Sequence, residues 1–388
     1  MSLLSKIKKK QYFQQKLEIP APIMILPKFP GLFACLFLAQ QLSHPILLAG
    51  DLIPLEYKSG KMLGRGHSGL STADEEDAIF YNPAGLAQGK GIYKKTVLLS
   101  PMLEFSSDTR DLIREVAVEE KTDVETLRKH IGQPQHLGIS NFSGVIFRRA
   151  AIGLFGNGQS DILISKSPEA GGLEQVDAGA DIMGGLSFSL ADSFFHKNLY
   201  FGITSKYLYR GEAGIHADLA EYDELQKIDP ADSLGMGNGF GLDYGMMWRG
   251  EGRVQKNFGL TVKNIGQTAI DPIDDASNAA GPIEQTINIG TSFVTAAYLS
   301  QIEFHFDIWD LTSAYTDNFY LKTHLGAELN LKKFIGLSAG LNQGYPTVGM
   351  FFDVYFLRLD LGAYTEEVGD NAGTRPDKRF YFRLAGGF

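Results

Sequence analysis

The residues that could support catalysis or metal binding are few, and their spacing does not group them into a site. His305 and His324 fall on the same face of neighbouring predicted strands, so they could share a metal ion, but no third ligand accompanies them. Zinc sites in proteins use three or four such ligands. The two imidazoles are therefore expected to act as hydrogen-bonding groups, and no Ser/His/Asp combination is indicated. The sequence predicts neither an enzyme nor a bound metal or cofactor.

A more informative group is the segment at residues 77–87, DAIFYNPAGLA. Its corner consists of Asn82, Pro83, Ala84 and Gly85. The Asn side chain can hydrogen-bond its own backbone, Pro fixes a turn, and the two small residues allow close approach to a neighbouring wall. Phe80 and Tyr81 add an apolar surface beside the corner. Two interpretations are open: the aromatic pair lines a ligand path, or the corner serves backbone geometry alone, which is the commoner use of turn residues.

The elements that must position this segment are strands, because from about residue 94 the apolar residues recur with a period of two. At residues 301–308, for example, Ile and Phe alternate with Gln, Glu, His and Asp. Fourteen strand candidates result: 94–105, 137–147, 150–163, 175–190, 198–210, 236–249, 256–266, 284–296, 300–310, 320–331, 334–343, 346–353, 356–365 and 378–388. A soluble sandwich alternates in the same way, so the period alone does not say which face meets water.

The connections between these strands alternate between long and short, and this pattern separates the two possibilities. The long connections are 106–136, 164–174, 211–235, 267–283, 311–319 and 366–377, and only the short link at 344–345 breaks the rule. Long loops at one end and tight turns at the other are the layout of an outer-membrane barrel. We therefore predict an all-β fold: a 14-stranded antiparallel transmembrane β-barrel at residues 93–388. Its apolar faces meet outer-membrane lipid, and short helices lie in its extracellular loops, at 108–131 and 215–227.

Both termini carry the signals expected of an exported barrel. Residues 1–49 combine a lysine-rich start with a broken apolar stretch and are predicted to be a signal peptide, with Met24 as an alternative start. At the other end Phe382, Leu384 and Phe388 step by two toward the terminus, although Gly386 interrupts the pattern. This ending resembles the signal read by the barrel assembly machinery, which is therefore an expected partner. The predicted location is the outer membrane of a Gram-negative-type bacterium.

Composition narrows the remaining possibilities. The net charge of −9 argues against a nucleic-acid partner, because such binding rests on basic patches. Beyond residue 49 no run of 18 apolar residues is present, so no transmembrane helix is predicted. Glycine occupies every second position at 235–241, which leaves one strand face bare. Close packing against that face is the favoured interpretation, and a lateral opening is the alternative.

A barrel of fourteen strands is too wide for side chains alone to fill, so residues 50–92 are predicted to form a plug. Residues 64–69, GRGHSG, together with 77–87 resemble the N-terminal hatch of the FadL family of outer-membrane transporters, and of the related PorV and TraF-like groups. The resemblance implies transport of hydrophobic small molecules such as long-chain fatty acids. The alternative that it leaves open is a barrel scaffold in a secretion or conjugation system, with a secretion partner instead of a hydrophobic ligand.

Overall fold

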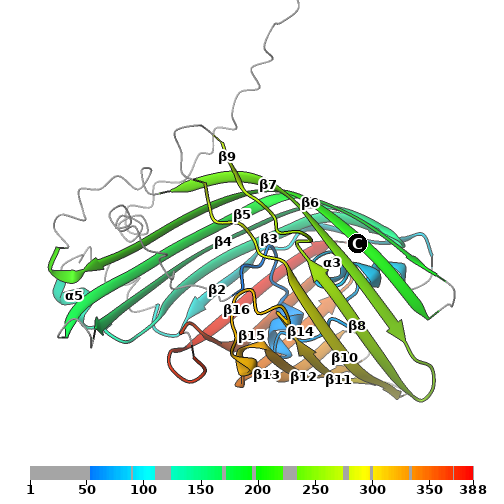
Figure 1. The fold of residues 1–388 in the computed structure, drawn as a ribbon. Helices are drawn as coiled ribbons and strands as arrows, with labels where there is room; N and C mark the ends of the chain where they lie inside the picture. Colours follow the sequence, from blue (N-terminus) through cyan, green and yellow to red (C-terminus); the bar gives the residue numbers. More distant parts are fainter. Residues whose placement is uncertain are drawn as a thin grey trace, which may run out of the picture. The chain divides into compact units, whose positions relative to one another are not determined.

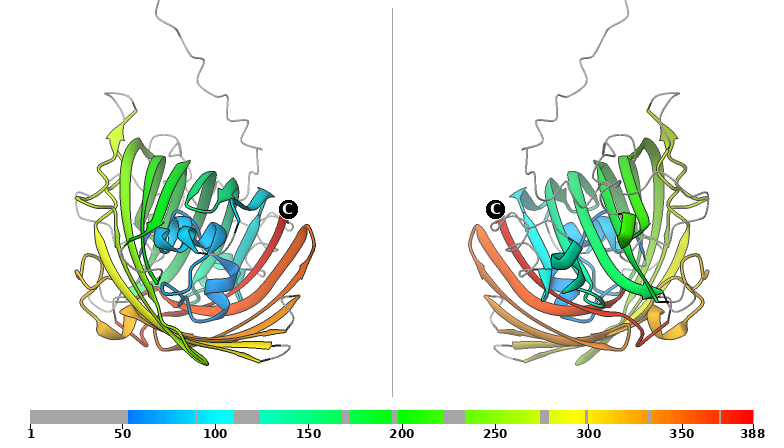
Figure 2. Two further views of the ribbon diagram at one scale, coloured as in Figure 1. Left: turned by 90° about the vertical axis from the view of Figure 1, so that its right-hand side faces the viewer. Right: turned by 90° about the vertical axis from the view of Figure 1, so that its left-hand side faces the viewer.

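The computed structural model describes residues 53–88, 91–109, 124–167, 172–194, 198–221, 234–273, 279–297, 300–331, 334–369 and 371–387, all of which belong to one compact unit. Long antiparallel strands form one curved, closed wall, and a short N-terminal segment lies within the curve (Figures 1 and 2). None of the helices in these ranges has the length and apolar character that a membrane span requires.

The strands occupy most of the described chain. They are β1 Tyr93–Leu99, β2 Met102–Ser106, β3 Gln135–Phe147, β4 Ala150–Ser167, β5 Leu173–Ser193, β6 Leu199–Asp218, β7 Gly235–Arg249, β8 Val254–Lys263, β9 Asp271–Pro272, β10 Thr286–Ala297, β11 Ser300–Ile308, β12 Thr323–Leu331, β13 Ile335–Asn342, β14 Tyr345–Val354, β15 Leu357–Glu367 and β16 Pro376–Gly387. The short helices are α2 Gly60–Gly64, α3 Glu75–Phe80, η2 Pro83–Ala87, α5 Val124–Arg128, η4 Leu219–Glu221 and η5 Phe319–Lys322.

Closure of the wall depends on its first strand, which is made of two pieces. β1 and β2 both pair with β16 on one side and with β3 on the other. Between them, the Ser100 N–H donates to the Asn141 side chain and the Ser100 hydroxyl donates to the Phe142 carbonyl. The two pieces therefore act as one strand with a bulge. Since β9 is a two-residue addition beside β7, the described wall has the fourteen strands that the sequence predicts.

Several boundaries differ from the prediction. β4, β5 and β6 run 18, 21 and 20 residues, so the predicted loop at 164–174 is strand at 164–167 and again at 173–174. The predicted helix at 215–227 is wrong at its start, because β6 continues to Asp218; the turn η4 follows, and residues 222–227 lie outside the described ranges. Polar side chains at these strand ends look like loop residues in sequence but pair across the strands, as His216 Nδ1 does with Asp177 Oδ1 at 2.5 Å. Of the predicted helix at 108–131, α5 is present and residues 110–123 lie outside the described ranges.

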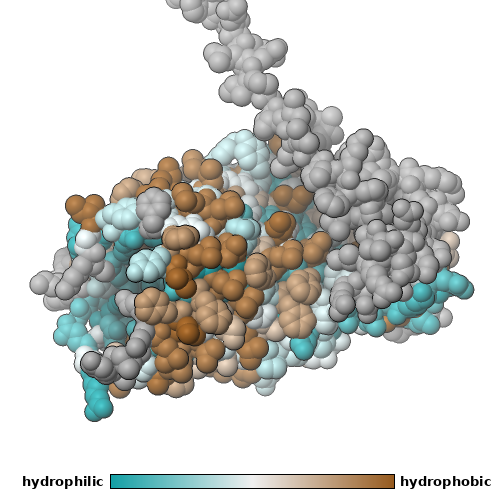
Figure 3. Space-filling view, turned by 180° about the vertical axis from the view of Figure 1, so that it is seen from behind, coloured by the Kyte–Doolittle hydropathy of each residue, from teal (hydrophilic) through white to brown (hydrophobic). Residues whose placement is uncertain are grey.

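The outer face of the wall is apolar. Side chains such as Ile139, Leu154, Phe188, Phe304 and Leu337 are exposed, and hydrophobic side chains cover the outer face in Figure 3, with hydrophilic ones gathered toward the ends. An exposed apolar surface of this extent requires a lipid environment. The lumen-facing positions between them are polar and buried, as Glu303, His305 and Asp307 are on β11. The protein is thus built as an outer-membrane β-barrel.

Residues 53–88, which we call the inner segment, lie inside the wall (Figure 2). Ser59 caps α2 by accepting from the Met62 N–H, and Asn82 caps η2 by accepting from the Ala84 N–H. These helices are too short to be stable alone, so the surrounding wall must hold them.

Candidate functional site

A row of wall glycines receives the inner segment. We call it the glycine belt, and it comprises Gly202, Gly245, Gly259, Gly326, Gly340 and Gly349, on strands β6, β7, β8, β12, β13 and β14. A Cβ atom at any of these positions would collide with the inner segment or with the side chains packed against it. At Gly202 it would meet the Pro83 backbone, and at Gly326 the Arg65 backbone. Because these positions carry no side chain, the backbone of the wall contacts the inner segment directly. On this side the inner segment is therefore held tightly against the wall.

The Asn-Pro-Ala-Gly corner docks on this belt. Asn82 is fully buried, and its Nδ2 donates to the carbonyls of Leu70 at 2.9 Å and Met246 at 3.1 Å. One of these acceptors belongs to the inner segment and the other to β7. The corner therefore ties the segment to itself and to the wall at once. Gly85 packs against the Ala73 carbonyl with no room for a side chain.

On the opposite side the contact is made by aromatic rings. Phe80 stacks on Tyr57 with ring centres 4.8 Å apart, and it meets the rings of Phe142 on β3 and Phe155 on β4 edge-to-face at 5.7 and 5.4 Å. The Tyr81 ring, by contrast, faces Trp309, which directly follows β11 on the belt side of the wall, at 5.8 Å, and the Tyr81 hydroxyl accepts from the Ser59 N–H. Rings can rotate where backbones cannot, so this side of the lumen is the more deformable one.

These rings belong to a continuous apolar column that runs through the lumen. At the end of the long loops it contains Leu55, Ile270, Ile283 and Trp309, and at the end of the short turns it contains Leu86, Ala87, Ile146, Ala151 and Ala191. Phe80, Phe142 and Phe155 lie between the two ends. A packed path of apolar side chains thus connects the two ends of the barrel.

Charged side chains flank the column, and they are paired. Lys58, Lys61, Arg65, Lys95, Lys206, Arg210, Lys263, Arg358, Arg379 and Arg383 each lie within 4.0 Å of a carboxylate. Glu56, for example, accepts from both Lys206 and Lys263. Burial opposes the ionisation of Glu56, but these two ammonium groups hold its pKa well below its ordinary value. When every ion pair of these ten cations is counted, they face fourteen different carboxylates, so this polar part of the lumen is slightly acidic.

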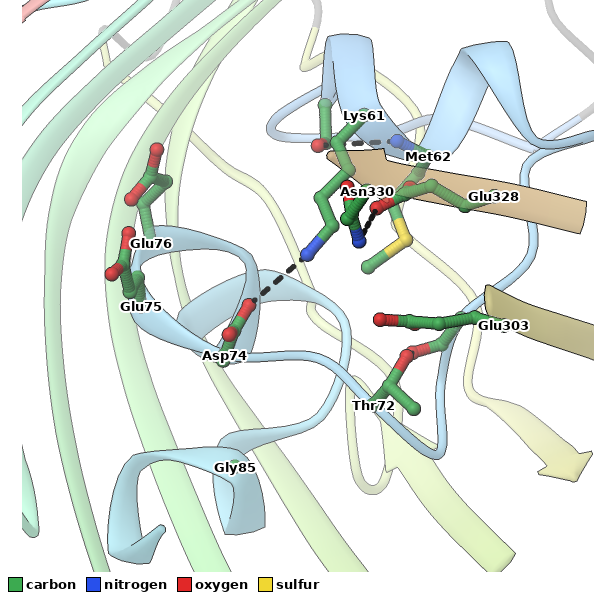
Figure 4. Close-up of polar contacts among 12 residues, drawn as sticks. Lys61, Met62, Thr72, Asp74, Glu75, Glu76, Gly85, Glu303, Glu328 and Asn330 are labelled. Atoms are coloured by element: carbon green, nitrogen blue, oxygen red, sulfur yellow. Dashed lines mark hydrogen bonds and ion pairs between the residues drawn. The ribbon is translucent and has the colours of Figure 1, made fainter. Parts of the chain in front are cut away.

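The turn end of the lumen is a charged vestibule. Lys61 donates to Asp74 at 3.4 Å, and the carboxylates of Glu303 and Glu328 point from β11 and β12 into the same space (Figure 4). The Arg65 guanidinium lies 3.3 Å from Glu328 and 3.6 Å from Glu303, and those two acids hold the pKa of Arg65 above its ordinary value against the effect of burial. In the described chain no group of three His, Cys, Asp or Glu side chains is arranged to hold a metal ion.

At the loop end of the column a small cavity of about 20 Å³ has room for a single water molecule. It is lined on one side by Leu55, Leu63 and Trp309 and on the other by polar groups that include His67 and His324. The His67 ring lies 4.7 Å from the Trp309 ring. A larger molecule would have to displace side chains here.

The structure brings together most of the residues that the sequence analysis identified as candidate site residues. Asn82, Pro83 and Ala84 lie on the glycine belt and Gly85 packs behind them against Ala73, whereas Phe80 and Tyr81 lie in the apolar column. Phe382 and Leu384 face outward on β16, whereas Phe388 lies outside the described residues. His305 meets Glu303 at 3.1 Å and His324 meets the Gly66 carbonyl at 3.2 Å, so both act as hydrogen-bonding groups.

Sequence reasoning missed other members of the site. Tyr57, Phe142 and Phe155 complete the aromatic contact, but each looks like an ordinary apolar or alternating residue in the sequence. The belt glycines were missed because the strand pattern does not distinguish a glycine that meets the inner segment from any other glycine of the wall. The bare face predicted at 235–241 does pack closely, against residues 268–271.

Comparison with proteins of known structure agrees with this architecture. No known family profile matches the chain, and no curated protein matches it. The CymD monoaromatic hydrocarbon channel matches 88% of this chain and 98% of its own length, with 10% sequence identity and a TM-score of 0.50. The toluene transporter TodX of P. putida (86% of this chain, 98% of its own, 11% identity, TM-score 0.46) and a FadL homologue of Pseudomonas aeruginosa (87%, 99%, 10% and 0.44) also match. The likeness to CymD confirms the predicted FadL-like fold.

Proposed function

We propose that the protein is an outer-membrane channel for hydrophobic small molecules and that its preferred cargo carries no charge. The observation that supports this most strongly is the apolar column, which connects the loop end to the turn end without interruption. Apolar molecules from the cell surface would move along this column in steps, staying in contact with apolar side chains at each step. The hydrocarbon channel CymD, whose fold the chain shares, is described as carrying cargo of this class.

The charges beside the column favour neutral cargo over long-chain fatty acids. The lumen cations described above already have carboxylate partners, and a fatty-acid carboxylate would have to displace one of them. It would also lose its hydration among groups that are already acidic, and burying an unpaired charge is costly. A hydrocarbon meets neither obstacle.

The inner segment has the role of a hatch in this proposal, with residues 50–92 as its extent. The corner residues 82–85 hold it to the glycine belt, which keeps that side closed. Phe80 and Tyr81 line the path, and on the side away from the belt Phe142 and Phe155, which contact Phe80, can change rotamer to let cargo pass. The signal peptide at residues 1–49 and the assembly role of the C-terminal residues are part of the same proposal.

Binding can be measured through the two tryptophans of the chain. Trp309 lies in the apolar column, whereas Trp248 faces lipid on β7. In a Trp248→Phe variant, bromododecane and bromododecanoic acid would each be titrated against Trp309 fluorescence. The two quenchers differ only by the carboxyl group. We expect saturable quenching by the hydrocarbon at a concentration about tenfold below that of the acid.

The matched control is Trp309→Phe, which keeps only the lipid-facing Trp248 and reports simple partition into detergent. Equal or stronger quenching of Trp309 by the acid would contradict the preference for neutral cargo. No saturable quenching by either compound, in a folded barrel, would contradict the channel itself and favour the scaffold function.

A further inference from the structure

A second apolar site lies on the outside of the barrel. A groove of about 570 Å³ crosses β5, β6 and β7 near the turn end. Its walls are formed by Phe188 and Leu190 on β5, Phe201 and Ile203 on β6, and Tyr244 on β7. The rings of Phe201 and Tyr244 lie 6.3 Å apart. Its volume falls in the range of small-molecule binding sites.

The groove opens to lipid and is closed toward the lumen. Its apolar side chains are the outward members of their strands, and Phe188, Leu190 and Ile203 are each about half exposed. Gly202 and Ala191 form its floor and point inward. Behind the groove the strand pairing continues without a break. β5 pairs with β6 from Leu190 opposite Ile203 to Asp192 opposite Phe201, and β6 pairs with β7 from Gly202 opposite Gly245 to Phe201 opposite Met246. The groove is therefore separate from the apolar column.

The rim of the groove carries one positive and one negative charge. Arg149, in the turn between β3 and β4, lies 3.1 Å from Asp192 at the end of β5, and both side chains are about half exposed. They stand at the short-turn end of the barrel, which faces the periplasm in outer-membrane barrels. The rim thus lies at the level of the head groups of the inner leaflet.

We propose that this groove binds a zwitterionic phospholipid of the inner leaflet, with one acyl chain against the five apolar side chains. The lipid phosphate pairs with Arg149 and its ammonium group pairs with Asp192. Each rim charge is opposite in sign to the head-group charge that it would meet, and the two rim charges, like the two head-group charges, lie a few ångström apart. An exposed ion pair is weak on its own, so the head group can replace it by two charge-assisted hydrogen bonds. An anionic head group has no ammonium group, so it would leave the Asp192 carboxylate without a cationic partner.

The test uses the intact barrel in nanodiscs that contain equal amounts of phosphatidylethanolamine and phosphatidylglycerol, followed by native mass spectrometry. We expect one retained phosphatidylethanolamine per barrel, in preference to phosphatidylglycerol. Replacing both rim residues (Arg149→Ala with Asp192→Ala) should reduce this retention about tenfold.

A second pair of variants tests the groove itself. Ser205→Phe places a ring in the groove, because Ser205 is an outward residue that lines it. Thr291→Phe is the control: it makes the same kind of change at an outward hydroxyl residue on β10, outside the groove. Ser205→Phe should abolish retention, and Thr291→Phe should leave it unchanged, with heat-modifiable gel mobility confirming that both barrels fold. Equal retention of the two lipids, retention of lipopolysaccharide instead, or unchanged retention in folded Ser205→Phe would overturn the proposal.

Discussion

Asp77 is a carboxylic acid held inside the protein, where its charged form is poorly solvated. Burial, together with the neighbouring Glu76 carboxylate, raises the pKa of Asp77 from 3.8 to about 6 against the opposing effects of Lys61 and Arg383. A group whose pKa is raised in the folded state stabilises the fold while it is protonated. That contribution is complete below pH 4 and is lost as the pH rises through 6.

We therefore expect the free energy of unfolding of the wild type to fall by about 3 kcal/mol between pH 4 and pH 7 through Asp77. The variant Asp77→Asn should show a flatter profile in this window, measured as the temperature of the gel-mobility transition. Glu76 and Asp74, whose pKa values are lowered from 4.5 and 3.8, lose their contribution to stability as the pH falls below those ordinary values. Both residues are present in the variant and in the wild type, so they do not mask the difference between the two profiles. Parallel profiles for variant and wild type would contradict this reading of Asp77.

Arg65 offers a second test at the scale of one residue. It is fully buried, its Nε donates to the Ser68 carbonyl at 2.7 Å, and it neutralises Glu303 and Glu328. Arg65→Met leaves both acids buried without their cation, so we expect a loss of about 3–5 kcal/mol. Adding Glu303→Gln and Glu328→Gln to this variant should recover part of the loss. Urea titration in micelles measures both, and an Arg65→Met barrel as stable as the wild type would refute the assignment.

Among the structural elements, the contact between the inner segment and the glycine belt is the most sensitive to small changes. Gly326→Leu places a side chain against the Arg65 backbone and the Ser68 side chain. We expect it to displace the inner segment and to raise the permeability of cells to small polar solutes several-fold, because the lumen is wide enough to leak. Gly158→Leu is the matched control, since a Cβ there meets only Ile139 and Ile182 on the outer face at ordinary distance. Equal permeability in the two variants would show that the belt does not hold the plug.

The strands could be predicted from the sequence, because an apolar outer face and a polar inner face impose a period of two on every wall strand. The ends of β4–β6 could not, since beyond the membrane the outer face no longer needs to be apolar and the period fades. The lumen contacts escape prediction for another reason. Arg65 in the inner segment and Glu328 on β12 are 263 positions apart, and nothing in the sequence around either residue says which charges will meet. The corner at residues 82–85 was found because turn chemistry is local.

For the whole molecule, the last strand closes the barrel against β1 and β2, and we predict that its C-terminal residues direct assembly. Phe388→Ser should lower the yield of folded barrel in the outer membrane, with a partial loss because Gly386 already departs from the apolar pattern. The measurement is the ratio of heat-modifiable to unfolded protein in outer-membrane fractions. Leu337→Ser, which changes a single outward residue on β13, is the control for general loss of apolar surface. A folded fraction equal to that of the wild type would remove Phe388 from the assembly signal.

Uptake by intact cells tests the central claim most directly, because the outer membrane, unlike a plain phospholipid bilayer, resists hydrophobic compounds. Cells that make the protein and cells that do not would be compared for uptake of a neutral aromatic hydrocarbon, a long-chain fatty acid and a small polar sugar. A channel along the apolar column should speed uptake of the hydrocarbon several-fold, speed that of the fatty acid less, and leave that of the sugar unchanged. Unchanged hydrocarbon uptake, with the barrel folded in the outer membrane, would contradict the account.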